Sequence, residues 1–440
     1  MTGSTTLVLG LGITGRAVVD ALTSRGMAVV GVDDFPSIEA LSQAARLNVP
    51  LVDCPNSADW PQLLNGVAEV VMGPGIPDAH PCHAAAASAN VSIIDESDLA
   101  ARWDHRPRCA VTGTNGKTTV VTLVVDMLER SGIRAMAAGN TDTPLVAAIN
   151  DIEVATFVVE ASSFRLGHAG LVTASPACWL NFAPDHLDVH ADLTAYETAK
   201  ARIFECVKEP QDAIANAADP VVMTHAPLDA LLFGGSATAC RVEGPTDSAR
   251  LIVDNEPLMH ISSLPRVLPH DLLNAQAAAA LAIRAGATRV ACAEALSAFT
   301  GLAHRMAFVA EVAGVRFVND SKATTPHATL AALTGVSGAV LIAGGRSKGV
   351  DLGVLGEAKP RTVVAIGEAA HELVGVFAGR CIVKTASSMA EAVALAHKAA
   401  AGAGTVLLSP GCSSFDWYES YVERGEDFSR IVHGLIEKKT

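Results

Sequence analysis

The chain has 440 residues, of which 50% are hydrophobic, 18% are charged and only 4% are aromatic. This composition excludes collagen-like, disordered and disulfide-scaffold proteins, and the length favours about two to four domains with cores of Ala, Val and Leu. Lys and Arg total 32 against 46 Asp and Glu, a formal net charge of −14. Such a charge argues against a general nucleic-acid or anionic-membrane binder, because its long-range field repels phosphate backbones.

The cysteine pattern and the hydropathy predict a cytoplasmic protein. The nine cysteines are odd in number, scattered and never spaced Cys-x-x-Cys, so we expect a reducing compartment and neither a disulfide framework nor a cysteine-based zinc site. The polar residues 1–6 do not resemble a signal peptide, and no uncharged apolar run reaches about 18 residues. We therefore expect no membrane insertion. From the charge we expect no nucleic-acid partner, and we expect a monomer.

Short runs of Val, Leu and Ile alternate with longer Ala-rich amphipathic stretches along most of the chain. This alternation predicts strand–helix units around buried, mostly parallel sheets, which is the α/β fold class. The predicted strands are Thr6–Gly10, Ala28–Val32, Cys109–Thr112, Ala155–Glu160, Ala177–Phe182, Ala339–Ala343, Thr362–Ile366 and Thr405–Leu408. The clearest predicted helices are Lys117–Arg130, Thr194–Val207, Leu272–Arg284 and Met389–Ala400.

Changes in composition along the chain predict three α/β domains. The polar stretch Asp95–Arg108 and the turn Gly301–Arg305 are the candidate boundaries. They delimit domains at residues 1–95, 96–302 and 303–440. Residues 226–263 contain short runs broken by Gly, Pro, Asp and Asn, which indicates a small meander or insertion inside the middle domain.

A first glycine-rich turn, from Gly10 to Gly15, has the spacing Gly-x-Gly-x-x-Gly after a predicted strand, and Asp33 closes the next strand. Such glycines permit a tight turn that points a helix N-terminus at a pyrophosphate, and an acid near Asp33 would bind a ribose hydroxyl. Three interpretations stay open: an NAD or FAD site, a turn that binds nothing, or a site for the diphosphate of another nucleotide.

A second glycine-rich loop lies between a predicted strand and a predicted helix, with the sequence Gly113-Thr114-Asn115-Gly116-Lys117-Thr118-Thr119. In such a loop backbone amides cradle phosphates, the lysine reaches the outer phosphates, and a hydroxyl such as that of Thr118 ligates Mg²⁺. Val111 stands where the usual eight-residue loop has its first glycine. Even so, Gly-Lys-Thr in this context favours ATP binding over a loop whose lysine is merely solvated.

Acidic and imidazole side chains follow two later strands. Glu160 ends a strand at the carboxyl edge where α/β sheets bind ligands, and residues 185–190 (Asp-His-Leu-Asp-Val-His) follow another strand. By itself the second segment also fits a zinc site or a helix cap with surface histidines. Beside an ATP loop it favours Mg²⁺, with phosphate oxygens completing the shell. Lys200 lies on the following helix, where its spacing alone indicates only a solvated face.

Several blocks occur in one order along the chain: the loop Gly113–Thr119, Glu160 with Ser162-Ser163-Phe164, residues 185–190, the helix Tyr196–Lys200, Gly301–Arg305, Asn319–Thr324 and the tail Ser409–Gly425. Together they resemble the Mur ligase family of ATP-dependent amide-bond-forming enzymes over essentially the whole length. The resemblance implies an N-terminal Rossmann-like domain that binds a UDP-linked substrate, a central P-loop ATPase and a C-terminal Rossmann-like domain that binds the incoming amino acid.

The resemblance also implies the ligands: ATP, two Mg²⁺ sites, UDP-N-acetylmuramoyl-L-alanine and D-glutamate, used in cytoplasmic peptidoglycan precursor synthesis. For the UDP-linked substrate it implies Leu11, Gly12, Ile13, Thr14, Gly15, Asp33, Asp34, Gly75, Asn140 and His186. For ATP it implies Gly113, Thr114, Asn115, Gly116, Lys117, Thr118, Thr119, Asn274, Arg305 and Asp320. For D-glutamate it implies Lys322, Thr324, Lys348, Ser414 and Tyr421.

By the same resemblance, Thr118, Glu160, His186 and a carbamate on Lys200 would hold Mg²⁺. The implied catalytic set is Lys117, Glu160, His186, Lys200, Arg305 and Lys322. Three positions depart from the family pattern: Asp271 and Thr325, where asparagine is usual, and Asp142, in a turn that lacks the usual second glycine.

Three competing functions remain to be weighed. An NAD-dependent oxidoreductase would use the first turn but has no need of Gly116-Lys117-Thr118. A nucleotide sensor has no need of the full set of implied catalytic residues. Another amino-acid-adding ligase, or a folate-type glutamate ligase, is disfavoured by the block Asp320–Thr324 and the C-terminal tail.

Overall fold

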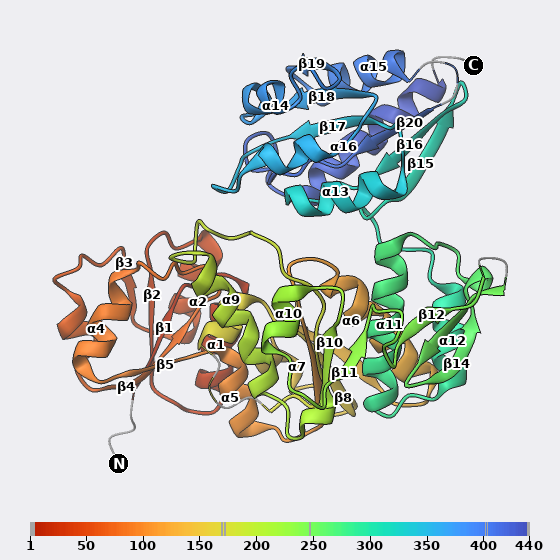
Figure 1. The fold of residues 1–440 in the computed structure, drawn as a ribbon. Coiled ribbons are helices and arrows are strands. Elements are labelled where there is room, and N and C mark those ends of the chain that lie inside the picture. Colours follow the sequence, from red (N-terminus) through yellow and green to blue (C-terminus); the bar gives the residue numbers. More distant parts are fainter. Residues whose placement is uncertain are drawn as a thin grey trace. The chain divides into compact units, whose positions relative to one another are not determined.

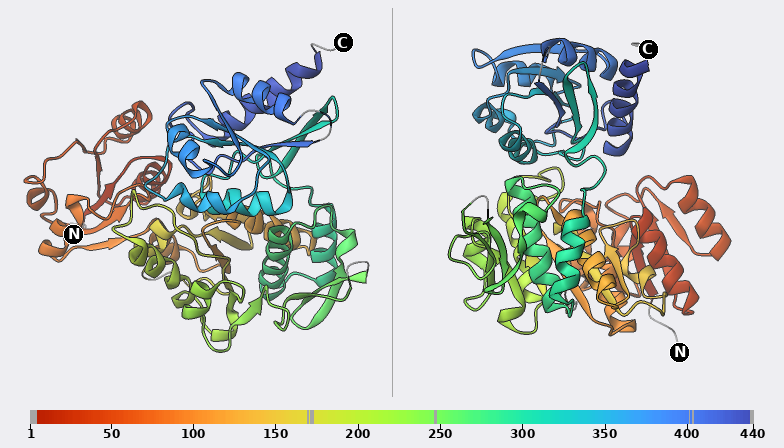
Figure 2. Two further views of the ribbon diagram at one scale, coloured as in Figure 1. Left: turned by 45° about the horizontal axis from the view of Figure 1, so that its top comes forward. Right: turned by 90° about the vertical axis from the view of Figure 1, so that its right-hand side faces the viewer.

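The computed structural model describes residues 5–168, 170, 173–245, 248–400, 402 and 404–437. This chain divides into two compact units (Figures 1 and 2). Unit 1 comprises Met1–Phe182, Val189–Val267 and Asp271–Phe299, and unit 2 comprises Ala183–Asp188, Leu268–His270 and Thr300–Thr440.

Unit 1 begins with a parallel sheet of strand order β3-β2-β1-β4-β5. Its strands are β1 (Thr5–Leu9), β2 (Val29–Asp33), β3 (Leu51–Asp53), β4 (Val67–Met72) and β5 (Ser92–Ile94). The connecting helices are α1 (Ile13–Ser24), α2 (Ile38–Leu47), α3 (Trp60–Leu63), α4 (Pro81–Ala89) and α5 (Glu96–Trp103). The order reverses between β1 and β4, so the turns after these two strands lie at the point where such sheets bind ligands.

Alternate side chains of β1 enter two different cores. Leu7 and Leu9 pack with Trp60 of α3, whereas Val8 packs with Val18 of α1. Because side chains alternate across a strand, the apolar run Leu7–Leu9 is explained by burial on both faces. The core that contains Val8 continues into the neighbouring sheet of the same unit, so the two sheets share one apolar interior.

The second parallel sheet of unit 1 has the order β11-β10-β9-β6-β8-β7. Its strands are β6 (Arg108–Thr112), β7 (Ala135–Gly139), β8 (Thr156–Glu160), β9 (Ala177–Trp179), β10 (Ala213–Asn216) and β11 (Leu231–Phe233). The associated helices are α6 (Lys117–Arg130), α7 (Leu145–Ala148), α8 (Ser163–His168), α9 (Leu193–Ala201), α10 (Pro220–His225), α11 (Pro269–Arg284) and α12 (Arg289–Ala298), with 3₁₀ turns η1 (Arg202–Glu205), η2 (Pro210–Asp212) and η4 (Ile261–Ser263). A small antiparallel sheet of β12 (Arg241–Glu243), β13 (Arg250–Val253) and β14 (Glu256–His260) is inserted before α11.

Unit 2 is built on a sheet of order β15-β16-β20-β17-β18-β19, in which only the β15–β16 pair is antiparallel. The strands are β15 (Ala307–Val312), β16 (Val315–Asn319), β17 (Val340–Gly344), β18 (Thr362–Ile366), β19 (Ile382–Ala386) and β20 (Gly404–Leu408). Its helices are α13 (Pro326–Gly335), α14 (Ala370–Val376), α15 (Met389–Ala399) and α16 (Tyr421–Glu437), with a 3₁₀ turn η5 (Leu352–Glu357). Separate cores on the two faces of the sheet make it doubly wound (Figure 2).

The predicted α/β class is confirmed, and the strand Thr362–Ile366 and the helix Lys117–Arg130 have the predicted bounds. The predicted helix over residues 194–207 is shorter, because α9 ends at Ala201 and tightens into the 3₁₀ turn η1. Residues 226–263 contain the expected meander, β12 to β14, but Leu231–Phe233 instead pairs with β10 at the edge of the parallel sheet.

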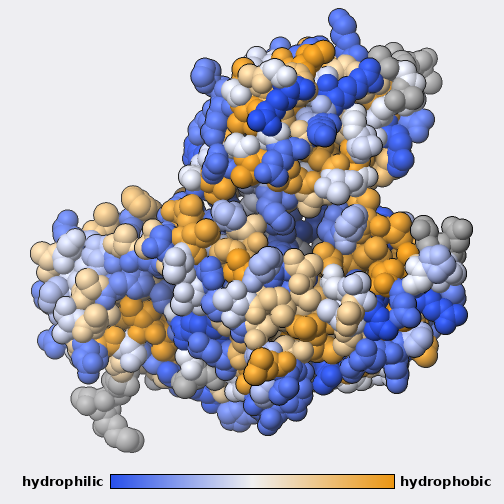
Figure 3. Space-filling view, in the orientation of Figure 1, coloured by the Kyte–Doolittle hydropathy of each residue, from blue (hydrophilic) through white to orange (hydrophobic). Residues whose placement is uncertain are grey.

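Among the described residues, none of the helices combines the length and apolar character that crossing a membrane requires. Figure 3 shows hydrophilic and hydrophobic residues interspersed over the visible face of the protein.

All nine cysteines are free, and we predict that Cys54 alone is alkylated rapidly in the native protein at pH 8. Cys54 is exposed, whereas burial raises the pKa of the Cys109 and Cys412 thiols to about 12 and so removes the reactive thiolate. Mass spectrometry after brief iodoacetamide treatment measures the site of labelling, and Cys54→Ser should abolish the rapid label. Labelling of Cys109 or Cys412 at the rate of Cys54 would contradict this prediction.

Candidate active site

The second glycine-rich loop connects β6 to α6 and depends on two glycines. Gly113 and Gly116 have φ of +152° and +90°, and a Cβ on Gly116 would lie 2.7 Å from Asn274 Oδ1. A side chain at Gly116 would therefore meet both backbone strain and its neighbour. The loop ends at the N-terminus of α6, where the backbone amides of the first helical turn favour an anion.

Asn181, which follows β9, fixes the shape of this loop. Its backbone oxygen accepts a hydrogen bond from Thr114 N (3.1 Å), its Oδ1 accepts one from Asn115 N (2.9 Å), and its Nδ2 donates to Asn115 O (3.0 Å). These contacts explain why β9 ends at Trp179, before the predicted end at Phe182. The sequence analysis missed Asn181; the only signal was its place after the strand that neighbours β6.

The side chains of the loop with a predicted role lie at the start of α6. Lys117 Nζ donates to Gly113 O (2.7 Å) and Thr114 O (3.0 Å), so its ammonium group curls over the turn. Thr118 and Thr119 occupy the first helical turn, and Thr119 lines a small cavity of about 30 Å³ together with Asn274. The structure therefore brings Asn274, far away in sequence, to the loop where the resemblance placed it.

Glu160 ends β8, the strand next to β6, and is 4% exposed. Its Oε1 accepts a hydrogen bond from Asn140 Nδ2 (3.2 Å), while its Oε2 is buried with no hydrogen-bond partner among the described residues. An anionic oxygen in this state suits a hard cation such as Mg²⁺. The part of the chain that is described has no cluster of three or more His, Cys, Asp or Glu side chains suited to a metal ion, so phosphate oxygens and water would have to complete the shell.

Lys200 is buried rather than solvated, contrary to what its spacing alone indicated. Lys200 is 2% exposed. Its Nζ donates to Gly113 O (3.0 Å) and lies 4.8 Å from the centre of the Tyr196 ring. Tyr196 OH in turn bonds Thr114 Oγ1 (3.1 Å). The helix α9 thus stabilises the loop through contacts of Lys200 with Gly113 and of Tyr196 with Thr114.

His186 lies in the segment Ala183–Asp188, which groups with unit 2. It has a positive φ of 56°, and its Nε2 lies 3.2 Å from Asp185 Oδ2.

The conformation of the first glycine-rich turn depends on its glycines and on hydrogen bonds to Asp33. A Cβ on Gly15 would lie 1.9 Å from Gly10 O, so no other residue fits there. The two carboxylate oxygens of Asp33 accept hydrogen bonds from Leu11 N (2.5 Å) and Phe35 N (2.8 Å). Asp33 therefore stabilises the turn, which weakens the interpretation in which its carboxylate binds a dinucleotide ribose.

Residues around this turn differ in their exposure. Gly12 and Ile13 are exposed, whereas Thr14 and Gly15 are buried. Asp34 is half-buried, and its Oδ2 lies 3.2 Å from His80 Nε2. Gly75 is exposed in the loop after β4. Only part of the predicted set can thus meet a ligand directly in this conformation.

In unit 2, the block after β16 is held by polar contacts. Asp320 accepts hydrogen bonds from Met306 N (3.1 Å) and Ser409 Oγ (2.8 Å), and Lys322 Nζ lies 3.7 Å above the Tyr421 ring. The cation and the aromatic ring predicted for amino-acid binding are therefore in direct contact.

The other predicted residues of unit 2 lie on loops and element ends around this sheet. Arg305 lies in the turn before β15, Thr324 just before α13, Lys348 in the loop after β17, and Ser414 in the loop after β20.

Arg424 of α16 organises these loops and was missed as a contributor by the sequence analysis. It is 1% exposed, donates to Ser321 Oγ (3.0 Å) and Ser321 O (2.8 Å), and also donates to Cys412 O (3.1 Å). Burial lowers the pKa of Arg424 to about 10. One buried guanidinium therefore joins the loop after β16 to the loop after β20.

The three departures from the family pattern have local explanations. Asp271 forms an ion pair with Arg266, with Nη2–Oδ1 at 2.6 Å. Thr325 caps α13 by accepting a hydrogen bond from Ala328 N. Asp142 is exposed in the turn after β7.

A phosphate loop at the carboxyl edge of a parallel sheet, with a buried acid on the adjacent strand, defines a nucleotide-dependent phosphate-handling enzyme. Three family models match successive parts of the chain: the MurD-like N-terminal domain of Mur ligases over residues 4–95, the Mur ligase middle domain over 111–282 and the Mur ligase glutamate ligase domain over 304–412. The UDP-N-acetylmuramoylalanine--D-glutamate ligase of Hahella chejuensis is 37% identical, over 97% of this chain and 98% of its own. The enzyme of the same name from Frankia casuarinae is 38% identical, over 98% and 94%.

The chain belongs to the Mur ligase family, and it is therefore an ATP-dependent ligase that forms amide bonds and uses Mg²⁺. Solved structures agree on the fold. A pseudomurein peptide ligase type C from Methanothermus fervidus aligns over 100% of both chains with a TM-score of 0.62 at 16% identity. The UDP-N-acetylmuramate-alanine ligase MurC from Thermotoga maritima aligns over 98% of this chain and 99% of its own, with a TM-score of 0.59 at 18% identity.

We predict that Glu160→Gln weakens the Mg²⁺-dependent part of nucleotide binding. The amide keeps the shape and the contact with Asn140 but replaces the buried anionic oxygen by a neutral group. Because outer-shell partners of a metal are already worth roughly 10- to 100-fold in affinity, loss of a direct ligand should cost no less.

Calorimetric titration of a non-hydrolysable ATP analogue, with and without Mg²⁺, measures this effect. Glu153→Gln, at an exposed position before β8, is the matched control and should behave as the wild type. An unchanged response of Glu160→Gln to Mg²⁺ would rule out Glu160 as a ligand.

Proposed function

We propose that the protein joins D-glutamate to UDP-N-acetylmuramoyl-L-alanine, with release of ADP and phosphate. The observation that carries the proposal is the carboxyl edge of the central sheet, where the phosphate loop, Glu160 and Lys200 converge. The names of relatives that are 33–38% identical over nearly the whole chain support the choice of substrates.

The chemistry requires activation, because a carboxylate does not accept an amine in water. Transfer of the γ-phosphoryl group of ATP to the terminal alanine carboxylate forms an acyl phosphate. The amine of D-glutamate then attacks the acyl carbon, and the tetrahedral intermediate expels phosphate. Lys117 and the amides of residues 113–119 would hold the phosphates of ATP, while Arg305, Asn274 and Asp320 would complete the nucleotide site.

Bound Mg²⁺ would offset the charge that gathers on the phosphates during transfer. We propose two cation sites, with Thr118 and Glu160 contributing to the first, and His186 and a carbamate on Lys200 to the second. The unpartnered Oε2 of Glu160 supports the first assignment.

We propose three domains, at residues 1–95, 96–302 and 303–440, which serve the UDP-linked substrate, ATP and the amino acid. The first would bind its ligand at the turns after β1 and β4, through Leu11–Gly15, Asp33, Asp34 and Gly75. Asn140 and His186, from outside residues 1–95, would also bind this substrate. In the third, Lys322 and Lys348 would pair with the two carboxylates of D-glutamate, beside Thr324, Ser414 and Tyr421. The proposed enzyme works in the cytoplasm as a monomer.

We predict that Lys117→Ala abolishes phosphate release that depends on both the UDP-linked substrate and D-glutamate. The variant loses the ammonium group that would face the outer phosphates, whereas Lys208→Ala, at an exposed position, should retain full activity. A coupled phosphate assay measures turnover, and mass spectrometry identifies the amide product with D-glutamate and with L-glutamate. Wild-type turnover by Lys117→Ala would refute the phosphate-loop assignment, and the absence of a new amide from the wild-type enzyme would refute the function.

We predict that Lys200→Ala loses most activity and that a small exogenous carboxylate, such as acetate, restores part of it. A carbamate on Lys200 would be an oxygen-donor anion, which a carboxylate can replace in the space left by the side chain. Lys208→Ala, assayed with and without acetate, is the control. Full activity of Lys200→Ala, or loss of activity that no carboxylate restores, would contradict the carbamate assignment.

A further inference from the structure

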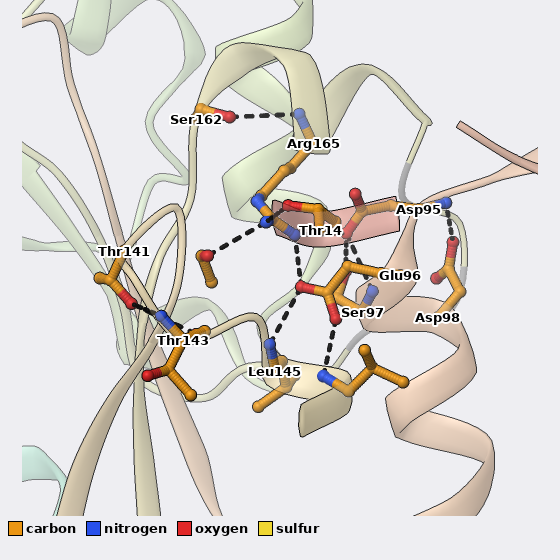
Figure 4. A network of polar contacts seen from close by, with 12 residues as sticks. Thr14, Asp95, Glu96, Ser97, Asp98, Thr141, Thr143, Leu145, Ser162 and Arg165 are labelled. Atoms are coloured by element: carbon orange, nitrogen blue, oxygen red, sulfur yellow. Dashed lines mark hydrogen bonds and ion pairs between the residues drawn. The ribbon is translucent and has the colours of Figure 1, made fainter. Parts of the chain in front are cut away.

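Arg165 lies in α8, five residues after Glu160, and its side chain is almost wholly buried at 4% exposure. Its Nη2 donates to Thr14 Oγ1 (3.1 Å) and to Gly139 O (3.0 Å), and its Nη1 contacts Glu96 (Figure 4). The sequence analysis did not single out this residue.

The two contacts of Nη2 reach two loops that the proposed function uses. Thr14 lies at the start of α1, in the turn proposed for the UDP-linked substrate. Gly139 ends β7 and precedes Asn140, which donates to Glu160 Oε1 (3.2 Å) and also, through its backbone N, to Glu160 O (2.8 Å). One guanidinium group therefore connects the substrate-binding turn of the first sheet to the proposed cation edge of the second sheet.

Acidic side chains at the start of α5 hold the guanidinium in this orientation. Glu96 is fully buried and also accepts hydrogen bonds from Leu145 N (3.1 Å) and Val146 N (2.7 Å), which begin α7. Asp95 Oδ1 lies 3.6 Å from Arg165 Nη1. Because Glu96 is itself tied to α7, which packs against α1 and α5, the position of Arg165 is set by several elements together.

The chemistry of arginine suits this task. A planar guanidinium presents several donors in a fixed fork, whereas the ammonium of lysine is a compact point charge on a flexible stem. Both terminal nitrogens of Arg165 are occupied by protein groups, so the side chain acts through Thr14 and Gly139 rather than on a ligand.

We propose that Arg165 is a positioning residue, which sets the spacing between the UDP-binding turn and the phosphoryl-transfer edge and so aligns the substrate carboxylate with ATP. This inference rests on the proposed function.

Arg165→Lys tests the proposal, because it keeps a positive charge beside Glu96 and removes the fork. Misplacement of reacting groups by about 1 Å costs roughly 100-fold, so we expect a fall of this order in kcat/KM for the UDP-linked substrate, through both a higher KM and a lower kcat. The KM for D-glutamate and the Kd for an ATP analogue should stay unchanged. Arg130→Lys, at an exposed position of α6, is the matched control.

A second variant acts on the acceptor end of the contact and leaves the pairing of Arg165 with Glu96 intact. Thr14→Val removes the acceptor oxygen and should reproduce the loss, with the KM for D-glutamate again unchanged. If both residues act through one contact, Arg165→Lys combined with Thr14→Val should be no worse than the poorer single variant.

Wild-type kinetics for Arg165→Lys would overturn the proposal, as would an equal loss of affinity for all three reactants in a folded variant. If Arg165→Lys does not fold, Thr14→Val decides, and wild-type kinetics of Thr14→Val would then overturn it. Failure of the proposed function is a different result, since in that case the wild-type enzyme itself makes no amide from D-glutamate.

Discussion

The proposed phosphate binding in this acidic chain depends on one turn, Gly113–Lys117, whose backbone is fixed in direction. With a formal net charge of −14, the protein repels polyphosphates at long range, so attraction must come from oriented dipoles and a few cations at short range. The positive φ values of Gly113 and Gly116 provide the direction, and the three hydrogen bonds of Asn181 keep it. The order of the strands places the supporting residues: β9 and β8 flank β6, so Asn181 and Glu160 lie on either side of the loop.

The same solution recurs in both units, where a buried arginine joins two loops that carry expected ligand contacts. Arg165 connects the turn at Thr14 to the turn at Gly139, and Arg424 connects Ser321 to Cys412. Burying a guanidinium costs solvation free energy, which hydrogen bonds to several partners offset. Loops held in this way lose little further conformational entropy when a ligand binds, which favours both affinity and alignment.

Residues whose role follows from local chain geometry were predictable from the sequence, whereas those that act through tertiary contacts were not. The phosphate loop and its helix follow from glycine spacing and an apolar strand, and Lys117 lies where that pattern put it. The burial of Lys200 against Gly113 O could not be derived from its spacing, because it depends on how α9 packs behind the loop. Arg165 carries no local signal and Asn181 carries only its place after a strand, since their partners lie 151 and 66 residues away.

Unmet hydrogen-bonding capacity points to the same region as the loop geometry. Among the described residues, four buried side-chain atoms lack a hydrogen-bond partner, and two of them, Glu160 Oε2 and Arg165 Nε, lie within one short segment. Leaving such atoms unpaired costs free energy of folding, so proteins rarely retain them in a packed core without a reason. For Glu160 the proposed cation site would supply such a reason, because an oxygen already satisfied within the protein would have to break a bond before it could bind a cation. The end of β8 and the start of α8 thus combine a carboxylate oxygen without a hydrogen-bond partner and an arginine held by several hydrogen bonds, an arrangement that suits the proposed cation site.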